Sequence, residues 1–219
     1  DTGTGGSWPC SSDRVVWALS AWNIYLATGD MDWLQKAYDI IGRSLEADFV
    51  VVYNPQTGLF RGESSFIDWR EQSYPVWAQP ADIYMSECLG TNAAYYGVLK
   101  VMEDMATILG KKMDVKKYGQ KAEALKKAIN DNFWVEEDGY YASYLYGRQN
   151  LTRTQQSETL GESFCVLFGI ADEERAAKVI SSMPVGEFGP PIFSPQIVSQ
   201  PDYHNNGVWP YVTSFWGKA

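Results

Sequence analysis

The feature that most constrains the fold is an alternation of two kinds of helical segment. Three mainly apolar segments are each followed by an amphipathic one: 15–27 and 31–49, 91–109 and 114–133, 157–168 and 172–183. The first is apolar on nearly every face, the second carries few charges, and the third is mostly apolar towards its end. A helix that is apolar all round is buried, whereas a helix with one apolar stripe covers a surface. Successive hairpins of this kind lay down an inner and an outer ring of helices. The pattern therefore predicts an all-α toroid, with a further helix beginning near Val208.

The connections between these segments differ in length according to their direction. The turns from an apolar segment to the next amphipathic one are short, and each contains a glycine: Gly29, Gly110 and Gly169. The return connections are long: 53–90, 134–156 and 184–207. Antiparallel hairpins place all the long connections at one end, so we expect them, with residues 1–12, to form a single rim over the inner ring. The alternative is that these loops only cover the ends of the helices.

Composition limits the class of partner. The chain has 219 residues, 45% of them hydrophobic, and a net charge of −9 at neutral pH. Nucleic acid and anionic membranes would be repelled by that charge, and no apolar run is long enough to span a bilayer. Cys10, Cys88 and Cys165 are widely spaced and form no CxxC pair, so neither a metal site nor a disulfide framework is indicated. We expect no metal and no cofactor.

One long connection, residues 58–77, is rich in side chains suited to chemistry. Acids and arginines alternate there with aromatic rings: Arg61, Glu63, Asp68, Arg70 and Glu71 with Phe60, Phe66, Trp69, Tyr74 and Trp77. An apolar neighbour raises the pKa of a carboxyl group towards proton donation. A flat ring packs against the C–H face of a sugar. We therefore expect this loop to form part of a glycosidase pocket.

Several short motifs, taken in order, resemble those of the six-hairpin glycosidases. They are Asp13-Arg-Val-Val-Trp17, Tyr25-Leu-Ala-Thr-Gly-Asp30, Thr57-Gly-Leu59 leading into Asp68-Trp69, Leu89-Gly-Thr-Asn-Ala93, Leu167-Phe-Gly-Ile-Ala-Asp172 and Asn206-Gly-Val-Trp-Pro210. Within that superfamily the chain is most similar to the processing α-glucosidases, trehalases and glycogen-debranching α-1,6-glucosidases. The resemblance runs over nearly the whole chain. It implies an (α/α)6 toroid and inverting hydrolysis of an α-glycosidic bond.

The resemblance also implies the catalytic residues. In such families the general acid is an aspartate in a long loop after an early outer helix, and Asp68 matches that placement; Glu71 and Glu63 are the alternatives. Inversion needs a second carboxylate roughly 6.5–9.5 Å away to hold the attacking water. The resemblance places that base late in the barrel, so we expect it beyond Ala219. Residues 1–219 would then be a partial catalytic domain, about half a barrel, completed by further segments or by another chain.

Other side chains of the expected rim are candidates for binding the sugar. The arginines could donate forked hydrogen bonds to hydroxyl groups or hold the acids in place, and each tryptophan could be a sugar platform or lie buried under the rim. Glu158 and Glu162 begin an apolar helix, where acids favour the helix dipole. The substrate-binding candidates are Trp8, Arg61, Glu63, Trp69, Arg70, Trp77, His204, Asn206 and Trp209.

Two other functions stay open at this point. A polysaccharide lyase on a helical toroid would use Asn, His, Tyr and Arg against a uronate, but it would need a basic cleft and this chain is acidic. A helical scaffold that binds partners without catalysis would fill the rim with its own side chains. The expected partner is an oligosaccharide or polysaccharide. The sequence leaves the compartment undetermined, and a glycan substrate favours a periplasmic or extracellular one.

Overall fold

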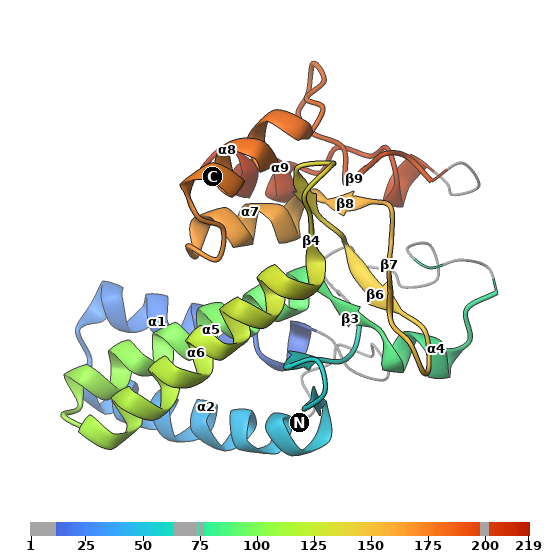
Figure 1. The fold of residues 1–219 in the computed structure, drawn as a ribbon. Coiled ribbons are helices and arrows are strands. Elements are labelled where there is room, and N and C mark those ends of the chain that lie inside the picture. Colours follow the sequence, from blue (N-terminus) through green and yellow to red (C-terminus); the bar gives the residue numbers. More distant parts are fainter. Residues whose placement is uncertain (1–11, 64–73, 75–76, 198–201) are drawn as a thin grey trace.

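The computed structural model describes residues 12–63, 74, 77–197 and 202–219, and its fold is mostly helical (Figure 1). None of the helices in these ranges is both long and apolar enough to cross a membrane. The helices are α1 (Trp17–Thr28), α2 (Met31–Val51), α4 (Pro80–Met85), α5 (Leu89–Ile108), α6 (Lys112–Phe133), α7 (Thr159–Leu167), α8 (Glu173–Ser182) and α9 (Pro210–Trp216), with 3-10 turns at Ser12–Arg14 and Asp202–His204. The short strands are β1 (Tyr53–Asn54), β2 (Leu59–Phe60), β3 (Glu87–Cys88), β4 (Trp134–Val135), β5 (Tyr140–Tyr141), β6 (Tyr144–Tyr146), β7 (Thr152–Arg153), β8 (Ser157–Glu158) and β9 (Phe193–Ser194).

Three helical hairpins form where the sequence patterns predict them. The pairs α1–α2, α5–α6 and α7–α8 are joined by turns in which Gly29, Gly110 and Gly169 have φ angles of 66°, 69° and 72°. This left-handed conformation ends a helix and costs glycine little. The side chains of Asp30 and Asp172 cap α2 and α8 by accepting hydrogen bonds from backbone N–H groups. The three helical hairpins predicted from the sequence are therefore confirmed.

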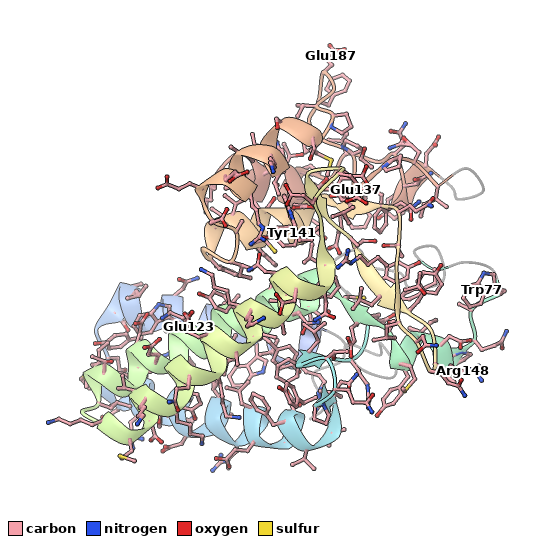
Figure 2. All side chains as sticks on the ribbon, viewed as in Figure 1. Trp77, Glu123, Glu137, Tyr141, Arg148 and Glu187 are labelled. Carbon is pink, nitrogen blue, oxygen red and sulfur yellow. The ribbon has the colours of Figure 1, made fainter. Side chains whose placement is uncertain are left out.

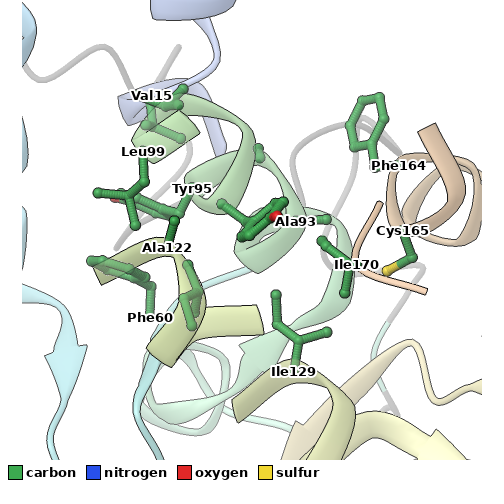
Figure 3. Close-up of a cluster of buried hydrophobic side chains, with 14 of the residues drawn as sticks. Val15, Phe60, Ala93, Tyr95, Leu99, Ala122, Ile129, Phe164, Cys165 and Ile170 are labelled. Carbon is green, nitrogen blue, oxygen red and sulfur yellow. The ribbon is translucent and has the colours of Figure 1, made fainter. Parts of the chain in front are cut away.

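Helix α5 lies at the centre of the core. It contacts α1, α2, α6 and α7, and its residues are buried on every face over most of its length, as the small number of charges in this segment predicts. Figure 3 shows Tyr95 and Leu99 of α5 near Phe60 of β2. The rings of Phe60 and Tyr95 stack with their centroids 3.7 Å apart. Because full burial of one large apolar side chain contributes about 1.5–3 kcal/mol, α5 is the element on which the others pack.

Helix α1 departs from the prediction. Its sequence is apolar on most faces, which predicts burial, yet within α1 only Ala18 and Ala21 are buried. Ile24 and Leu26 are 45% and 60% exposed. In the part of the chain that the structure describes, α1 packs on α2 and α5, so its other faces are left uncovered. The prediction that α1 is buried all round was wrong, because burial depends on neighbours that periodicity does not reveal.

Asp48 lies on the buried face of α2, where it interrupts the apolar stripe. Its carboxylate accepts a hydrogen bond from Arg14 Nε at 2.8 Å and one from the Tyr95 hydroxyl at 2.9 Å. Burial raises the pKa of Asp48, and its contacts with Arg14 and Tyr95 act in the opposite direction. The acid thus ties the turn before α1 to α2 and α5, and its charge is paired, which a buried charge requires.

The long connections pair with one another at one end of the helices. Strand β3 of the first connection pairs with β6 of the second, in a sheet completed by β7, and β8 of the second pairs with β9 of the third. In Figure 1 these strands lie to the right of α5, α6 and α7, away from the short turns. The described parts of the three long connections therefore meet at one end, as expected; residues 1–11, which the sequence also assigns to this rim, lie outside the described residues. The all-α prediction omitted its strands because runs of two or three residues are too short to show a strand's alternation.

Two consecutive units of the chain share the same plan. Each outer helix, α2 or α6, is followed by a small hairpin, β1–β2 or β4–β5, which turns at Gly58 or Gly139 with φ angles of 77° and 73°. Each inner helix, α5 or α7, is then entered through a related motif, Ser86-Glu-Cys-Leu-Gly90 or Ser157-Glu-Thr-Leu-Gly161. The two motifs lie against each other, since a Cβ atom on Gly161 would be 3.1 Å from the Gly90 nitrogen. The inner helices therefore approach so closely at Gly161 that any larger residue would have to displace its neighbours.

Replacing Gly161 by alanine tests this close approach. The new methyl group would also lie 3.0 Å from Leu89 Cδ2, so we expect Gly161→Ala to lower the free energy of unfolding by about 1–3 kcal/mol, the usual cost of overpacking. Urea denaturation measures the change. Gly42→Ala in α2 is the control, because the nearest atom to its Cβ would be 3.4 Å away and alanine favours a helix by about 1 kcal/mol. Equal stability of the two variants would contradict the packing described here.

Candidate active site

The structure describes part of the site that the sequence predicts. The following lie outside the described residues: Trp8, Asp68, Trp69, Arg70, Glu71 and the side chain of His204. The roles of Asp68 and Glu71 as catalytic acids therefore stay predictions. The candidates that the structure does place are Arg61, Glu63, Trp77, Asn206 and Trp209.

The loop that carries Asp68 starts beside the N-terminus of α5. Glu63 is buried, and its backbone carbonyl accepts a hydrogen bond from Thr91 Oγ1 at 2.7 Å. The backbone N–H of Gly62 donates to the Ser86 carbonyl at 2.7 Å, and Gly62 forms a parallel bridge with Glu87. The first residues of the loop are thus fixed at the rim end of an inner helix. A role for Glu63 in binding the substrate stays a prediction.

Asn92, in the first turn of α5, holds the hairpin from which this loop departs. Its Oδ1 accepts the backbone N–H of Phe60 at 2.7 Å, and its Nδ2 donates to the carbonyls of Phe60 at 3.0 Å and Cys88 at 2.9 Å. The buried side-chain amide of Asn92 therefore satisfies both the backbone N–H and the backbone carbonyl of Phe60, at the end of β2. Buried backbone groups need such partners, so Asn92 sets the position at which the chain leaves towards Asp68.

Glu87, also buried, anchors the same hairpin from β3. Its Oε1 accepts hydrogen bonds from Asn54 Nδ2 at 2.7 Å and Thr57 Oγ1 at 2.9 Å. Burial raises the pKa of Glu87, against the lowering effect of these two bonds and of the nearby charge of Arg61. Its Oε2 is shut off from solvent and has no hydrogen-bond partner in the described ranges. One oxygen of this acid is thus committed to holding β1 and β2.

Glu162 does for β5 what Asn92 does for β2. Its Oε1 accepts the backbone N–H of Tyr141 at 2.7 Å and the Ser157 hydroxyl at 2.9 Å. Complete burial raises its pKa to about 8; the hydrogen bonds from Tyr141 and Ser157 lower it, and the charge of Glu158 raises it further. Glu162 is therefore mainly protonated at neutral pH; unlike the Asn92 amide, which donates to two carbonyls, its second oxygen Oε2 has no hydrogen-bond partner among the described residues. Through its hydrogen bonds with Tyr141 and Ser157, Glu162 stabilises the rim, a role in addition to the favourable interaction with the helix dipole that the sequence suggests.

The aromatic candidates differ in exposure. Trp77 is 59% exposed and its ring centroid lies 5.9 Å from that of Tyr146, so a flat apolar face is available at the edge of the rim (Figure 2). Trp209 is buried, and its Nε1 donates to the Tyr203 carbonyl at 3.1 Å. Asn206 is exposed nearby. Trp77 has the geometry of a sugar platform and Trp209 that of a side chain under the rim, and substrate binding by either stays a prediction.

Sequence reasoning missed the residues that fix the rim. Asn92 and Glu87 were not singled out, and Glu162 was interpreted only through the helix dipole. For Glu87 a signal was present, since the Ser-Glu-x-Leu-Gly motif occurs at the start of both α5 and α7; Asn92 and Glu162 lie just beyond it. A motif repeated at the same structural place indicates a shared task, which here is to attach a long connection to an inner helix.

The pH dependence of stability tests the protonated state of Glu162. Its pKa rises from an ordinary 4.5 to about 8 on folding. The contribution of Glu162 to the stability of the fold is fully present below pH 4.5 and is lost as the pH rises through 8. In this range the carboxyl group has already lost its proton in the unfolded chain but still keeps it in the folded one, so a rising pH favours unfolding. We expect the free energy of unfolding to fall by up to about 1.4 kcal/mol per pH unit in this window. Glu162→Gln, which cannot ionise, removes this slope.

Urea denaturation at pH 5, 6.5 and 8 provides the measurement, with Glu173→Gln on the exposed first turn of α8 as the control. The control variant should keep the slope of the unmodified protein. If the difference in stability between Glu162→Gln and the unmodified protein stays constant from pH 5 to pH 8, the carboxyl group is not protonated in the folded state.

Comparisons with known proteins identify the domain. A family model of the bacterial alpha-L-rhamnosidase six-hairpin glycosidase domain matches residues 8–185. A solved GH78 rhamnosidase of Bacillus sp. GL1 superposes with a TM-score of 0.60 and 21% identity over 77% of this chain and 17% of that one. Neutral trehalase of Saccharomyces cerevisiae gives a TM-score of 0.54 and 15% identity over 86% of this chain and 47% of that one.

A curated relative, N,N'-diacetylchitobiose phosphorylase of Vibrio proteolyticus, is 24% identical over 148 residues, which is 65% of this chain and 17% of that protein. The chain thus spans less than half of the length of each of these three proteins. At such identities the solved structures establish a shared fold, the six-hairpin helical toroid, and the trehalase is one of several neighbours that share it. The family model covers most of the chain, and the chain belongs to the bacterial alpha-L-rhamnosidase six-hairpin glycosidase domain family.

Proposed function

We propose that this domain takes part in the hydrolysis of an α-linked neutral sugar with inversion at the anomeric carbon. The observation that carries the proposal is the family match over residues 8–185, which names α-L-rhamnosidases. The motifs from Asp13 to Pro210 also resemble those of α-glucosidases and trehalases. We therefore take an α-L-rhamnoside as the first substrate and an α-glucoside as the second.

In this proposal Asp68 is the general acid that protonates the leaving oxygen, and Glu71 is the alternative in the same loop. Trp69 follows Asp68 in the sequence, and an indole beside a carboxyl group would raise its pKa, as proton donation near neutral pH requires. Glu87 and Glu162 are poor candidates for the base, because each uses an oxygen to hold a hairpin. We assign the base to a carboxylate that the rest of the barrel contributes.

The arrangement of the rim supports the role proposed for Asp68. The long connections are joined by strand pairs at the end where α5 and α7 begin. The loop with Asp68 departs from that end, next to Glu63 and Thr91. A loop fixed there at its start is suited to lie over the mouth of the inner ring. Trp77, at the other end of the loop, presents an exposed ring to a sugar in the same region.

Hydrolysis of aryl α-glycosides by the full-length protein tests the proposal. We expect release of nitrophenol from the α-L-rhamnoside or the α-glucoside, and a loss of about 100-fold to 10,000-fold in kcat on Asp68→Asn, the usual contribution of a general acid. Proton NMR of the first product should show the inverted anomer. Asp39→Asn on the exposed face of α2 is the matched control.

Full activity of Asp68→Asn would remove this residue from the mechanism. Activity lost on Glu71→Gln alone would transfer the role to Glu71. An increase in ultraviolet absorbance from an unsaturated uronate, without hydrolysis of either glycoside, would indicate a lyase instead. The absence of all these signals would favour a scaffold that does not catalyse.

A further inference from the structure

A pocket of about 260 Å³ opens on the outer side of the rim, between two hairpin turns. Asn54, Thr57 and Arg61 of the first long connection form one wall, and Arg148 and Leu151 of the β6–β7 turn form part of the other. Arg148 lies at the outer edge of this region in Figure 2. The volume is below the about 300–1,000 Å³ of sites for drug-sized ligands, so the pocket suits one sugar unit.

The lining of this pocket differs in charge from the rest of the chain. The chain carries a net charge of −9, yet the lining contains two arginines and no acid. Its other members supply amides, at Gln56, Gln149 and Asn150, and a small apolar surface from Met85 and Leu151. Amides can bind sugar hydroxyls, and the apolar pair can face the C–H side of a ring. An arginine without an ion pair in the described ranges would make such a wall locally positive on an acidic protein, and this points to an anionic group on the ligand.

Of the two arginines, Arg61 is the one suited to hold that anion. Arg148 is bound to Asp82 by hydrogen bonds of 2.6 and 3.2 Å. Arg61 is half-buried; its Nε is shut off from solvent and has no hydrogen-bond partner among the described residues, so a ligand in the pocket would meet the terminal nitrogens of the guanidinium group. Glu87 lies close enough for the charge of Arg61 to act on it, but no ion pair within 4 Å joins the two in the described ranges. A guanidinium group matches a carboxylate through two parallel hydrogen bonds.

The walls of the pocket are fixed before any ligand arrives. Asn54 is buried, and its side chain donates to Glu87 and accepts the backbone N–H of Gln56 at 3.1 Å. Thr57 donates to the same Glu87 oxygen. The ion pair of Arg148 with Asp82 holds the opposite turn against α4. A preformed site loses less entropy on binding than a mobile one.

We propose that this pocket binds a carboxylate-bearing sugar, a hexuronate, with its carboxylate on Arg61 and its hydroxyls on the surrounding amides. The binding itself is independent of catalysis. One further step rests on the proposed function: the uronate is a neighbouring unit of the same glycan from which the toroid removes a neutral sugar. The pocket would then select acidic heteropolysaccharides over neutral ones.

Calorimetric titration of the full-length protein with glucuronate and with glucose tests the binding directly. We expect glucuronate to bind at least about tenfold more tightly than glucose, which is the contribution of one charge-assisted pair, and more weakly at high salt. Arg61→Gln should abolish this preference, and Arg61→Lys, which keeps the charge but loses the fork, should retain part of it. Arg43→Gln on the exposed face of α2 is the matched control.

Thermal denaturation of each variant separates loss of the ligand from loss of the fold. Equal binding of glucose and glucuronate, no binding of glucuronate at millimolar concentration, or an unchanged preference in folded Arg61→Gln would each overturn the proposal. Because these titrations measure binding without turnover, their result is independent of whether the protein hydrolyses α-glycosides.

Discussion

The structure depends on how its long connections are attached to the inner helices. A connection of 20 to 40 residues has many backbone groups to satisfy, and here buried polar side chains at the start of α5 and α7 satisfy some of them. Asn92 holds Phe60, and Glu162 holds Tyr141. Glu87 adds the side chains of Asn54 and Thr57. These contacts attach the first two connections to α5 and α7, and the strand pairs β3–β6 and β8–β9 join all three connections into one rim.

This attachment explains why a mainly apolar core can support polar chemistry at one end. The helices pack around α5 through apolar contacts. At the end opposite the rim, they are joined by short turns at Gly29, Gly110 and Gly169. The rim, in contrast, presents Trp77, Asn206 and the start of the Asp68 loop on a fixed base. Functional side chains on loops need such a scaffold to hold their geometry. The rhamnosidase family match is consistent with a rim built for glycans.

Much of this fold could be predicted from the sequence, because helical periodicity and glycine turns are local signals. The hairpins ending at Gly29, Gly110 and Gly169 are such cases. The exposure of Ile24 and Leu26 and the pairing of β3 with β6 could not be read in this way, because they depend on contacts far apart in the chain. For the site, aromatic and acidic clustering predicts a role for the loop 58–77, and that role stays a prediction, whereas Glu87 and Glu162 were hidden as ordinary acids near helix starts. Their burial, which sequence does not report, decides their role.

The most direct test of the central claim is a crystal structure of the full-length Asp68→Asn protein with an α-L-rhamnoside or α-glucoside bound. The account predicts the sugar at the rim, beside the first turns of α5 and α7, with the side chain of residue 68 within about 3 Å of the glycosidic oxygen. A sugar bound at the end that carries Gly29, Gly110 and Gly169, or residue 68 turned away from it, would contradict the account.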